Sequence, residues 1–246
     1  MLVVLNHLGG LALALPLALL GALGLLELAR LARLPSRAAA PGAVAVAAVV
    51  LVALDADGER VPIGAAVALA AMAAAVLLAT DGARSRAAAV TAGGLLWLGG
   101  GLVHAVLLRD LTHGAGLVIA VLLATFIGDT AAQLGGSAFG HRRLAPRISP
   151  NKTVEGLAAG IAVGTAACVA AAFVHDWLSV GEALVLGLAC TLAAPAGDLF
   201  ESALKRRAGV KDSGRTFGAH GGVLDRVDAA LAAAVAGFYV ALALGL

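Results

Sequence analysis

The chain has 246 residues, of which 61% are hydrophobic and 13% are charged, and its mean hydropathy is +0.98. So few polar groups cannot coat a soluble globule of this size, which excludes a water-soluble domain and places the chain in a bilayer. The formal net charge of +2 gives no support to a nucleic-acid-binding protein, and Cys168 and Cys190, both in apolar runs, show no pattern of a disulfide framework or zinc site.

Apolar stretches of membrane-spanning length recur along the whole chain. A helix needs roughly 20 mostly apolar residues to cross the hydrocarbon core. We therefore predict an all-α polytopic membrane protein with about eight transmembrane helices, with seven to nine left open because the second stretch is short and Pro16 interrupts the first. The predicted spans are residues 4–29, 39–54, 62–80, 87–108, 114–138, 156–174, 181–200 and 225–246.

The first stretch resembles a secretion signal only superficially. No Lys or Arg precedes Arg30, so the basic segment that opens a signal peptide is missing, and the apolar run is too long. We interpret it as a retained membrane helix.

Basic residues alternate between the loops that join these spans. The first, third, fifth and seventh loops hold 15 of the 17 Lys and Arg residues, and the other loops hold only Arg60 and Arg109. Because cytoplasmic loops of membrane proteins are enriched in Lys and Arg, an even number of spans with both termini outside is expected. The expected location is a bacterial inner membrane, with the odd-numbered loops facing the cytoplasm.

Four acidic residues lie where this topology does not explain them. Asp129 is inside the fifth span, Asp198 lies toward the end of the seventh, and Asp225 and Asp228 open the eighth. An Asp at mid-membrane depth costs at least ~2.5 kcal/mol on insertion scales, so such acids are candidates for function. Helical spacing stacks Asp198 on Ser202 and Asp225 on Asp228. If the two helix ends meet, their oxygens suit a hard cation such as Mg²⁺; the alternatives are favourable helix-end charges and pairing with Arg.

A basic, Gly-rich segment lies beside these acids in the sequence. Its glycines would let backbone N–H groups approach a phosphate, and its bases would neutralise one. Acids and bases together indicate a site for phosphate and a divalent metal, as phosphoryl or nucleotidyl transfer requires. The residues of this segment are Lys205, Arg206, Lys211, Arg215, His220, Gly221, Gly222 and Arg226.

The fifth loop contains a second candidate patch. Pro146 and Pro150 forbid a continuous helix there, and Ser149, Lys152 and Thr153 offer donors just before the sixth span begins. A cation at a helix start is unfavourable for the helix itself, so Lys152 is either a topology signal or a ligand for an anion.

The stretch SALKRRAGVKDSGRTFGAHGGVLDRVD, residues 202–228, resembles the motif of the phosphatidate cytidylyltransferases, also called CDP-diacylglycerol synthases. The segments GDTAA, RISPNKTVEG and GDLFES are similar to further blocks of that family, so the resemblance covers roughly residues 125–228. Gly218 and Ala219 stand where family members commonly have Pro-Gly, which makes that turn less rigid. Residues before 125 match only in hydrophobic character.

The resemblance implies an Mg-dependent nucleotidyltransferase of phospholipid biosynthesis that converts CTP and phosphatidate to CDP-diacylglycerol and pyrophosphate. A second cation is left open, and a homodimer is expected. Asp198 and Asp225 would be the principal metal ligands, with Asp129 and Asp228 beside them. The implied catalytic residues are Lys205, Arg206, Lys211, Asp212 and Arg226, and the implied substrate-binding residues are Ser149, Lys152, Thr153, Ser202, His220, Gly221 and Gly222.

Two other functions compete with this interpretation. One is a related enzyme with another lipid acceptor, such as a CTP-dependent polyprenol kinase or an ether-lipid cytidylyltransferase. The other is a cation-coupled transporter, because intramembrane acids and small-residue helices also line ion pathways. In domain terms we expect N-terminal transmembrane helices over residues 1–124 and a C-terminal transmembrane catalytic region over 125–246, with cytoplasmic loops at 139–155 and 201–224.

Overall fold

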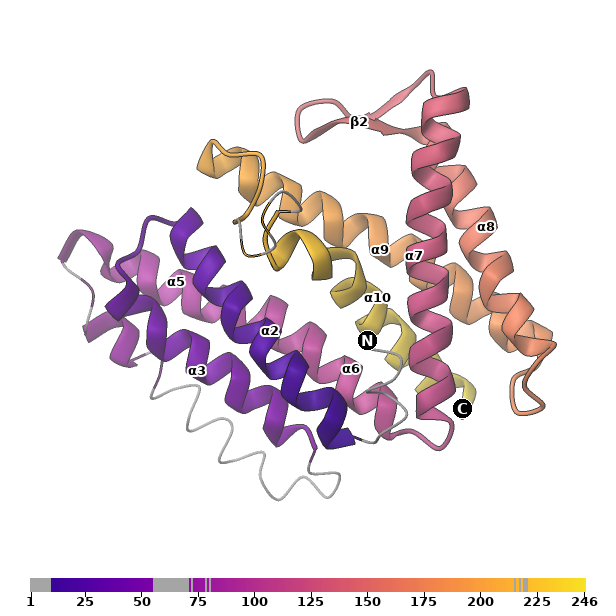
Figure 1. Ribbon diagram of the computed structural model, residues 1–246, viewed down its shortest axis with the longest axis horizontal. Helices are drawn as coiled ribbons and strands as arrows, with labels where there is room; N and C mark the ends of the chain where they lie inside the picture. Colours follow the sequence, from indigo (N-terminus) through magenta and orange to yellow (C-terminus); the bar gives the residue numbers. More distant parts are fainter. Residues whose placement is uncertain are drawn as a thin grey trace.

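The computed structural model shows a helical protein with one small β-hairpin (Figure 1). It describes residues 10–54, 71, 73–77, 79, 81–214, 216, 218 and 221–246. Six helices in this part of the chain are long and apolar enough to cross a membrane, and a seventh apolar helix is shorter. The protein is therefore an all-α polytopic membrane protein, as predicted.

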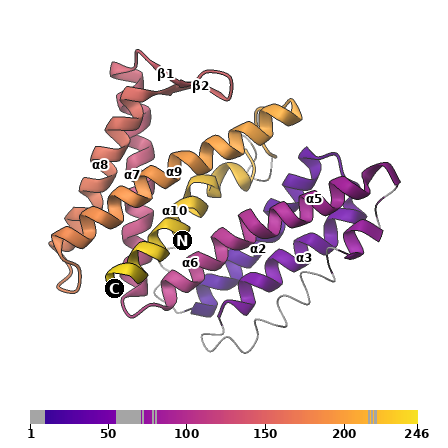
Figure 2. The ribbon, with the colours of Figure 1, turned by 180° about the vertical axis from the view of Figure 1, so that it is seen from behind.

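The N-terminal helices form one side of the molecule (Figures 1 and 2). α2 (Gly10–Leu31) packs antiparallel to α3 (Ser36–Val52), and a third rod is built from α5 (Arg84–Gly94), a π-helical turn (Leu95–Gly99) and α6 (Gly100–Asp110). The short 3₁₀ turn Asp81–Ala83 precedes α5. Leu, Val and Ala side chains from all three rods fill a common core, so this group is held together mainly by apolar packing.

The C-terminal helices form the other side. α7 (Gly114–Phe139) lies against α8 (Val154–Ala172), and between them the chain forms an antiparallel hairpin of β1 (Arg143–Ala145) and β2 (Ser149–Thr153). α9 (Val180–Ala208) and α10 (Leu224–Leu244) pack together between α7–α8 and the N-terminal group (Figure 2). α10 thereby joins the two groups, since it contacts both α9 and α6.

The predicted spans correspond to these helices with few changes. α2 runs without a break through Pro16, so the first span is a single helix. The predicted third span, residues 62–80, lies largely outside the described residues. α9 extends to Ala208 rather than ending near 200, because Lys and Arg are good helix formers and Gly209, at φ +76°, supplies the left-handed residue that ends it. The first part of the predicted loop 201–224 is therefore helical. The division of the chain at residue 124 stays a prediction; α7 crosses that position.

Glycines allow the C-terminal helices to approach closely. A Cβ atom on Gly164 of α8 would lie 2.5 Å from the Ala124 carbonyl oxygen and 2.6 Å from the Thr191 methyl carbon. A Cβ on Gly160 would lie 2.8 Å from the Gly128 carbonyl oxygen. Without a hydrophobic driving force between helices in lipid, such close backbone contact is what holds them together. α7, α8 and α9 are thereby held in tight contact.

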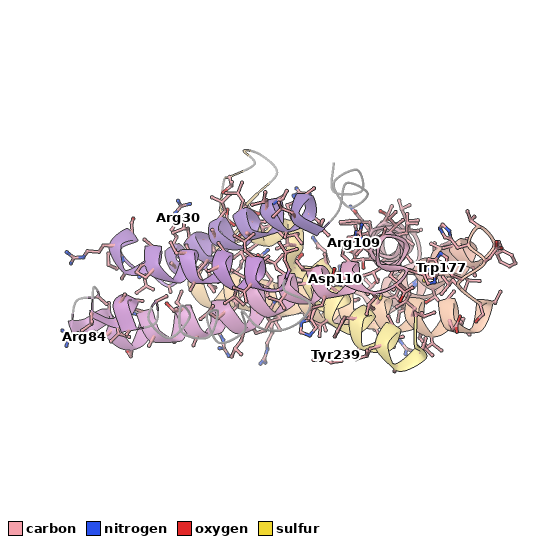
Figure 3. The ribbon with its side chains drawn as sticks, turned by 90° about the horizontal axis from the view of Figure 1, so that it is seen from below. Arg30, Arg84, Arg109, Asp110, Trp177 and Tyr239 are labelled. Atoms are coloured by element: carbon pink, nitrogen blue, oxygen red, sulfur yellow. The ribbon has the colours of Figure 1, made fainter. Side chains whose placement is uncertain are left out.

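The loops fall at two ends of the molecule. Arg30 and Arg84, from the first and third predicted loops, lie toward one end, whereas Arg109, Asp110 and Trp177 lie nearer the other (Figure 3). The hairpin, the end of α9 and the start of α10 are on the side of the molecule where α2 ends (Figure 1). The elements that flank the first, fifth and seventh predicted loops therefore lie on one side of the molecule, as the alternation of charge predicts.

Replacing Gly164 by Ala should destabilise the protein, because the added methyl group meets backbone and methyl atoms that cannot move aside. We expect a loss of about 1–3 kcal/mol, the usual cost of overpacking. Gly181→Ala is the matched control, since Gly181 is also helical but, in the described part of the chain, no packed neighbour from elsewhere lies within 4 Å of the added Cβ. Thermal unfolding of the detergent-solubilised variants measures the difference; equal melting temperatures would contradict this packing.

Candidate active site

A cavity of about 580 Å³ opens at the basic end of the C-terminal group. It lies between α7, α8, α9 and the hairpin, and its walls combine apolar and small residues with charged and amide side chains. Volumes of this size are typical of small-molecule sites. Its polar lining residues are Asp129, Gln133, Ser137, Arg143, Asn151, Lys152, Thr153 and Asp198.

The central contact of this cavity joins β2 to α9. Lys152 Nζ lies 2.5 Å from Asp198 Oδ2, and the two side chains are 25% and 31% exposed. Ser202 Oγ, one helical turn after Asp198, donates a hydrogen bond of 3.3 Å to Asp198 Oδ1. The predicted stacking of Asp198 and Ser202 is thus present. The sequence left open whether Lys152 is a topology signal or a ligand for an anion. In the structure its ammonium group forms an ion pair with Asp198 at the cavity.

Two further carboxylates lie within electrostatic range of this pair. The charges of Asp198 and Lys152 both act on Asp129, on α7, and on Asp228, on α10. Asp129 lines the cavity, whereas Asp228 is 9% exposed and accepts a 2.8 Å hydrogen bond from the Ala229 amide. Lys152 and Asp198 thus interact electrostatically with two further acids, of which Asp129 lines the cavity and Asp228 is buried on α10. We call Asp129, Lys152, Asp198, Ser202 and Asp228 the cavity cluster.

A second charged cluster lies where α9 ends and α10 begins. Lys205 Nζ lies 2.6 Å from Asp225 Oδ1 and also forms an ion pair with Glu201, one turn earlier on α9. Glu201 is fully buried, and among the described residues its carboxylate oxygens have no hydrogen-bond partner beyond that ion pair. Removing Lys205 would leave Glu201 buried and uncompensated, so this ion pair is a structural requirement of the helix end.

The other oxygen of Asp225 holds the segment that precedes α10. Asp225 Oδ2 accepts hydrogen bonds from the Ser213 amide at 3.0 Å, the Ser213 hydroxyl at 2.8 Å and the Gly222 amide at 2.8 Å. Gly221 has φ +83°, and a Cβ there would lie 2.8 Å from Asp225 Oδ2. Gly221 and Gly222 are therefore needed for a turn that wraps around a carboxylate, in addition to any phosphate contact.

Glu27, on α2, is a member of this second cluster that the sequence prediction missed. It is 1% exposed, and its carboxylate accepts hydrogen bonds from Ser213 Oγ, Thr216 Oγ1 and the Leu224 amide. A signal was present, since Glu27 is the only acidic residue among the first 54 and lies near the end of an apolar span. We call Glu27, Glu201, Lys205, Ser213, Thr216 and Asp225 the loop cluster.

The remaining predicted residues have varied surroundings. Arg206 donates from Nε to the Ile148 carbonyl at 3.1 Å and from a terminal nitrogen to the Val210 carbonyl at 3.3 Å, so it ties α9 to the hairpin. Thr153 caps α8 by accepting from the Gly156 amide at 3.1 Å, and Ser149 begins β2 opposite Ala145.

Lys211 and Asp212 are exposed in the segment after α9. Arg226 lies on an exposed position of α10 and lines an apolar cavity near α2 and α7. His220 is outside the described residues.

The two acids expected to bind one metal ion have different partners. Asp198 pairs with Lys152 in the cavity cluster, and Asp225 is saturated by Lys205, Ser213 and Gly222 in the loop cluster. Within the described part of the chain, no three His, Cys, Asp or Glu side chains are grouped closely enough to hold an ion by themselves. Mg²⁺ commonly takes only one or two carboxylates and completes its shell with water and substrate phosphate, so the two carboxylates that line the cavity, Asp129 and Asp198, fit it. That Asp198 and Asp225 share an ion stays a prediction.

The chain is similar in sequence to several known enzymes. The chain is 42% identical over 126 residues to a phosphatidate cytidylyltransferase of Mycobacterium leprae, which covers 50% of this chain and 39% of that protein. It is 40% identical over 132 residues to the enzyme of that name from Haemophilus influenzae, covering 51% and 45%, and 41% identical over 133 residues to that of Thermotoga maritima, covering 52% and 49%.

These matches reach about half the length of the curated relatives. The model of the Cytidylyltransferase family, by contrast, matches residues 1–244 of this chain, which is nearly its whole length. This chain, with its two acid-rich clusters at the basic end of a helical membrane protein, therefore belongs to the cytidylyltransferase family.

Proposed function

We propose that the protein is a phosphatidate cytidylyltransferase that converts CTP and phosphatidate to CDP-diacylglycerol and pyrophosphate. The observation that carries this proposal is the cavity cluster, where Lys152 and Asp198 meet at the wall of a cavity large enough for a nucleotide. The family membership and the names of relatives that are about 40% identical support the same activity.

The proposed reaction needs little proton transfer. An oxygen of the phosphatidate phosphate, already anionic near neutral pH, forms a bond to the α-phosphorus of CTP, while the bond from that phosphorus to the β-phosphate bridging oxygen breaks. Pyrophosphate leaves with the electron pair. Since no strong general base is required, the protein's contribution is to position the two anions and neutralise their charge.

Charge neutralisation can be assigned to residues of the cavity cluster. Lys152 has the position to contact a phosphate oxygen if substrate displaces it from Asp198, since both side chains are partly exposed at the cavity. Lys205 is less available, because Glu201 and Asp225 both hold it. Lys211, exposed beyond α9, remains a candidate for the triphosphate, and Arg206 and Arg226 remain predicted contacts.

A magnesium ion would be held by Asp198 together with Asp129, which lines the same cavity, or with Asp228, which interacts electrostatically with Asp198. When bound, the ion would polarise phosphate oxygens and offset the charge that develops on pyrophosphate. Asp225 would take part only if Lys205 were displaced from it. The second cation and the homodimer stay predictions.

The proposed membrane location of the site is based on the distribution of charge and on the apolar composition. The basic loops and both clusters lie at one end of the helices, which we propose is the cytoplasmic side of a bacterial inner membrane, where CTP is available. Phosphatidate would reach the cavity sideways from the bilayer, because its acyl chains must stay in the apolar layer while its phosphate meets the cavity.

Labelled CTP distinguishes this reaction from its closest rival. With purified protein and phosphatidate, label on the α-phosphorus should move into lipid and label on the γ-phosphorus should leave as pyrophosphate. A CTP-dependent lipid kinase would instead transfer the γ-label, and an ether-lipid cytidylyltransferase would require another acceptor. Proteoliposomes that take up cations without any need for CTP would favour the transporter.

Asp198→Asn should lower the rate of transfer at least 100-fold, because it removes the partner of Lys152 and a carboxylate proposed for the metal. Asp176→Asn is the control, since Asp176 is an exposed acid in the loop between α8 and α9, away from both clusters. Both variants are compared with the parent protein in the α-labelled assay at equal amounts of monodisperse protein. Near-normal activity of Asp198→Asn would exclude an essential role for this carboxylate.

Removing divalent cations with EDTA should abolish transfer, and added Mg²⁺ should restore it. The reason is that the carboxylates of Asp129 and Asp198 in the cavity wall would repel a triphosphate unless a divalent cation offsets their charge. The α-labelled assay measures the effect. Full activity in excess EDTA would contradict the proposed metal.

A further inference from the structure

Glu27 joins the N-terminal helices to the segment that precedes α10. Its Oε2 accepts a 3.1 Å hydrogen bond from Ser213 Oγ and a 3.0 Å bond from the Leu224 amide, and its Oε1 accepts a 2.5 Å bond from Thr216 Oγ1. These donors are more than 180 residues away along the chain. A buried carboxylate needs such donors, so the segment and Glu27 stabilise each other.

The backbone of this segment closes tightly around the carboxylate. A Cβ atom on Gly214 would lie 2.5 Å from Glu27 Oε1, and one on Gly222 would lie 2.4 Å from Glu27 Oε2. Any side chain at either position would collide with the carboxylate. Gly214 and Gly222 are therefore matched to an acid on α2.

Glu27 also acts as the cap of α10. Val223, at the N-cap position, provides no side-chain hydrogen bond to the helix start, whereas the Leu224 amide donates to Glu27. The negative charge is stabilised by the positive end of the helix dipole, and an orphan amide is satisfied. The helix that carries Asp225 and Asp228 thus begins on a carboxylate supplied by another helix.

Ser213 connects this cap to Asp225. Its hydroxyl oxygen lies 3.1 Å from Glu27 Oε2 and 2.8 Å from Asp225 Oδ2, but it has a single hydrogen to donate. The two carboxylates therefore share one donor. A shift of Ser213 on losing Glu27 would change the hydrogen bonding of Asp225, which in turn holds Lys205.

We propose that Glu27 is a positioning residue of the enzyme: from α2, it holds Ser213, Gly222 and Leu224 in the arrangement that fixes the start of α10, which carries Asp225 and Asp228, for turnover. This inference rests on the proposed function for its effect on catalysis, but not for its effect on the loop. It makes the N-terminal helices part of the site and not only an anchor in the bilayer.

Three variants test the proposal. Glu27→Leu keeps an apolar helix but removes every acceptor. Glu27→Gln keeps an acceptor for Ser213 and Leu224 and turns its amide NH₂ toward Thr216 Oγ1, which can accept. Leu19→Ala, at a position of α2 that is 60% exposed, is the control for changes to the helix itself.

Two measurements are made on each variant in detergent. Hydrogen exchange of peptides carrying the Ser213, Gly222 and Leu224 amides reports the segment without any need for activity, and the α-labelled assay at saturating CTP reports kcat. Glu27→Leu should exchange at least 10-fold faster at these amides and lose at least 10-fold in kcat. Glu27→Gln and Leu19→Ala should stay within about threefold of the parent protein in both.

The outcomes separate the proposals. Parent-like exchange in Glu27→Leu overturns the positioning role, and so does fast exchange with unchanged kcat, which would make Glu27 only structural. If Glu27→Leu does not fold, the same two measurements are made on Thr216→Ala, which removes one donor to Glu27 from an exposed residue. Faster exchange together with a lower kcat would support the positioning role, and parent-like values of both would overturn it. If the parent protein itself transfers no CMP, the proposed function fails, while the exchange data still show whether Glu27 holds the segment.

Discussion

A carboxylate at or near the apolar layer of a membrane needs a cation or several hydrogen-bond donors, and this requirement organises the basic end of the protein. Asp198 has Lys152 and Ser202, Asp225 has Lys205, Ser213 and Gly222, and Glu27 has two hydroxyls and a helix amide. In each case the partners link separate parts of the fold: β2 with α9, α9 with α10, and α2 with α10. The ends of α2, α9, α10 and the hairpin are therefore coupled through their acids as well as through apolar contacts.

The helix packing supplies a rigid base for these charged groups. Glycine contacts bring α7, α8 and α9 together at backbone distance, and α10 links that group to α6 and α2. Because helices in such close contact cannot shift independently, the cavity cluster keeps its geometry at the end of the bundle. A reaction that depends on placing two anions, rather than on moving a proton, benefits from this rigidity.

Much of the fold and part of the site could be predicted from the sequence. Long apolar stretches indicate membrane helices whatever their neighbours are, so the six long described helices all fall on predicted spans. The i, i+4 spacing likewise predicted the contact of Asp198 with Ser202. The extension of α9 to Ala208 was missed, because a charged end was interpreted as a loop although Lys and Arg favour helix.

The sequence by itself determined the class of protein, the family, the charged end and most of the acids, because hydropathy, charge alternation and motif spacing are local properties of the chain. Only the tertiary structure decided which acid meets which base. Lys152 faces Asp198 and not Asp225, Arg206 holds the hairpin, and Glu27 reaches Ser213 across 186 residues. The physical reason is that ion pairs and caps between distant segments depend on how helices cross, and crossing is set by side-chain packing that leaves no periodic trace in the sequence.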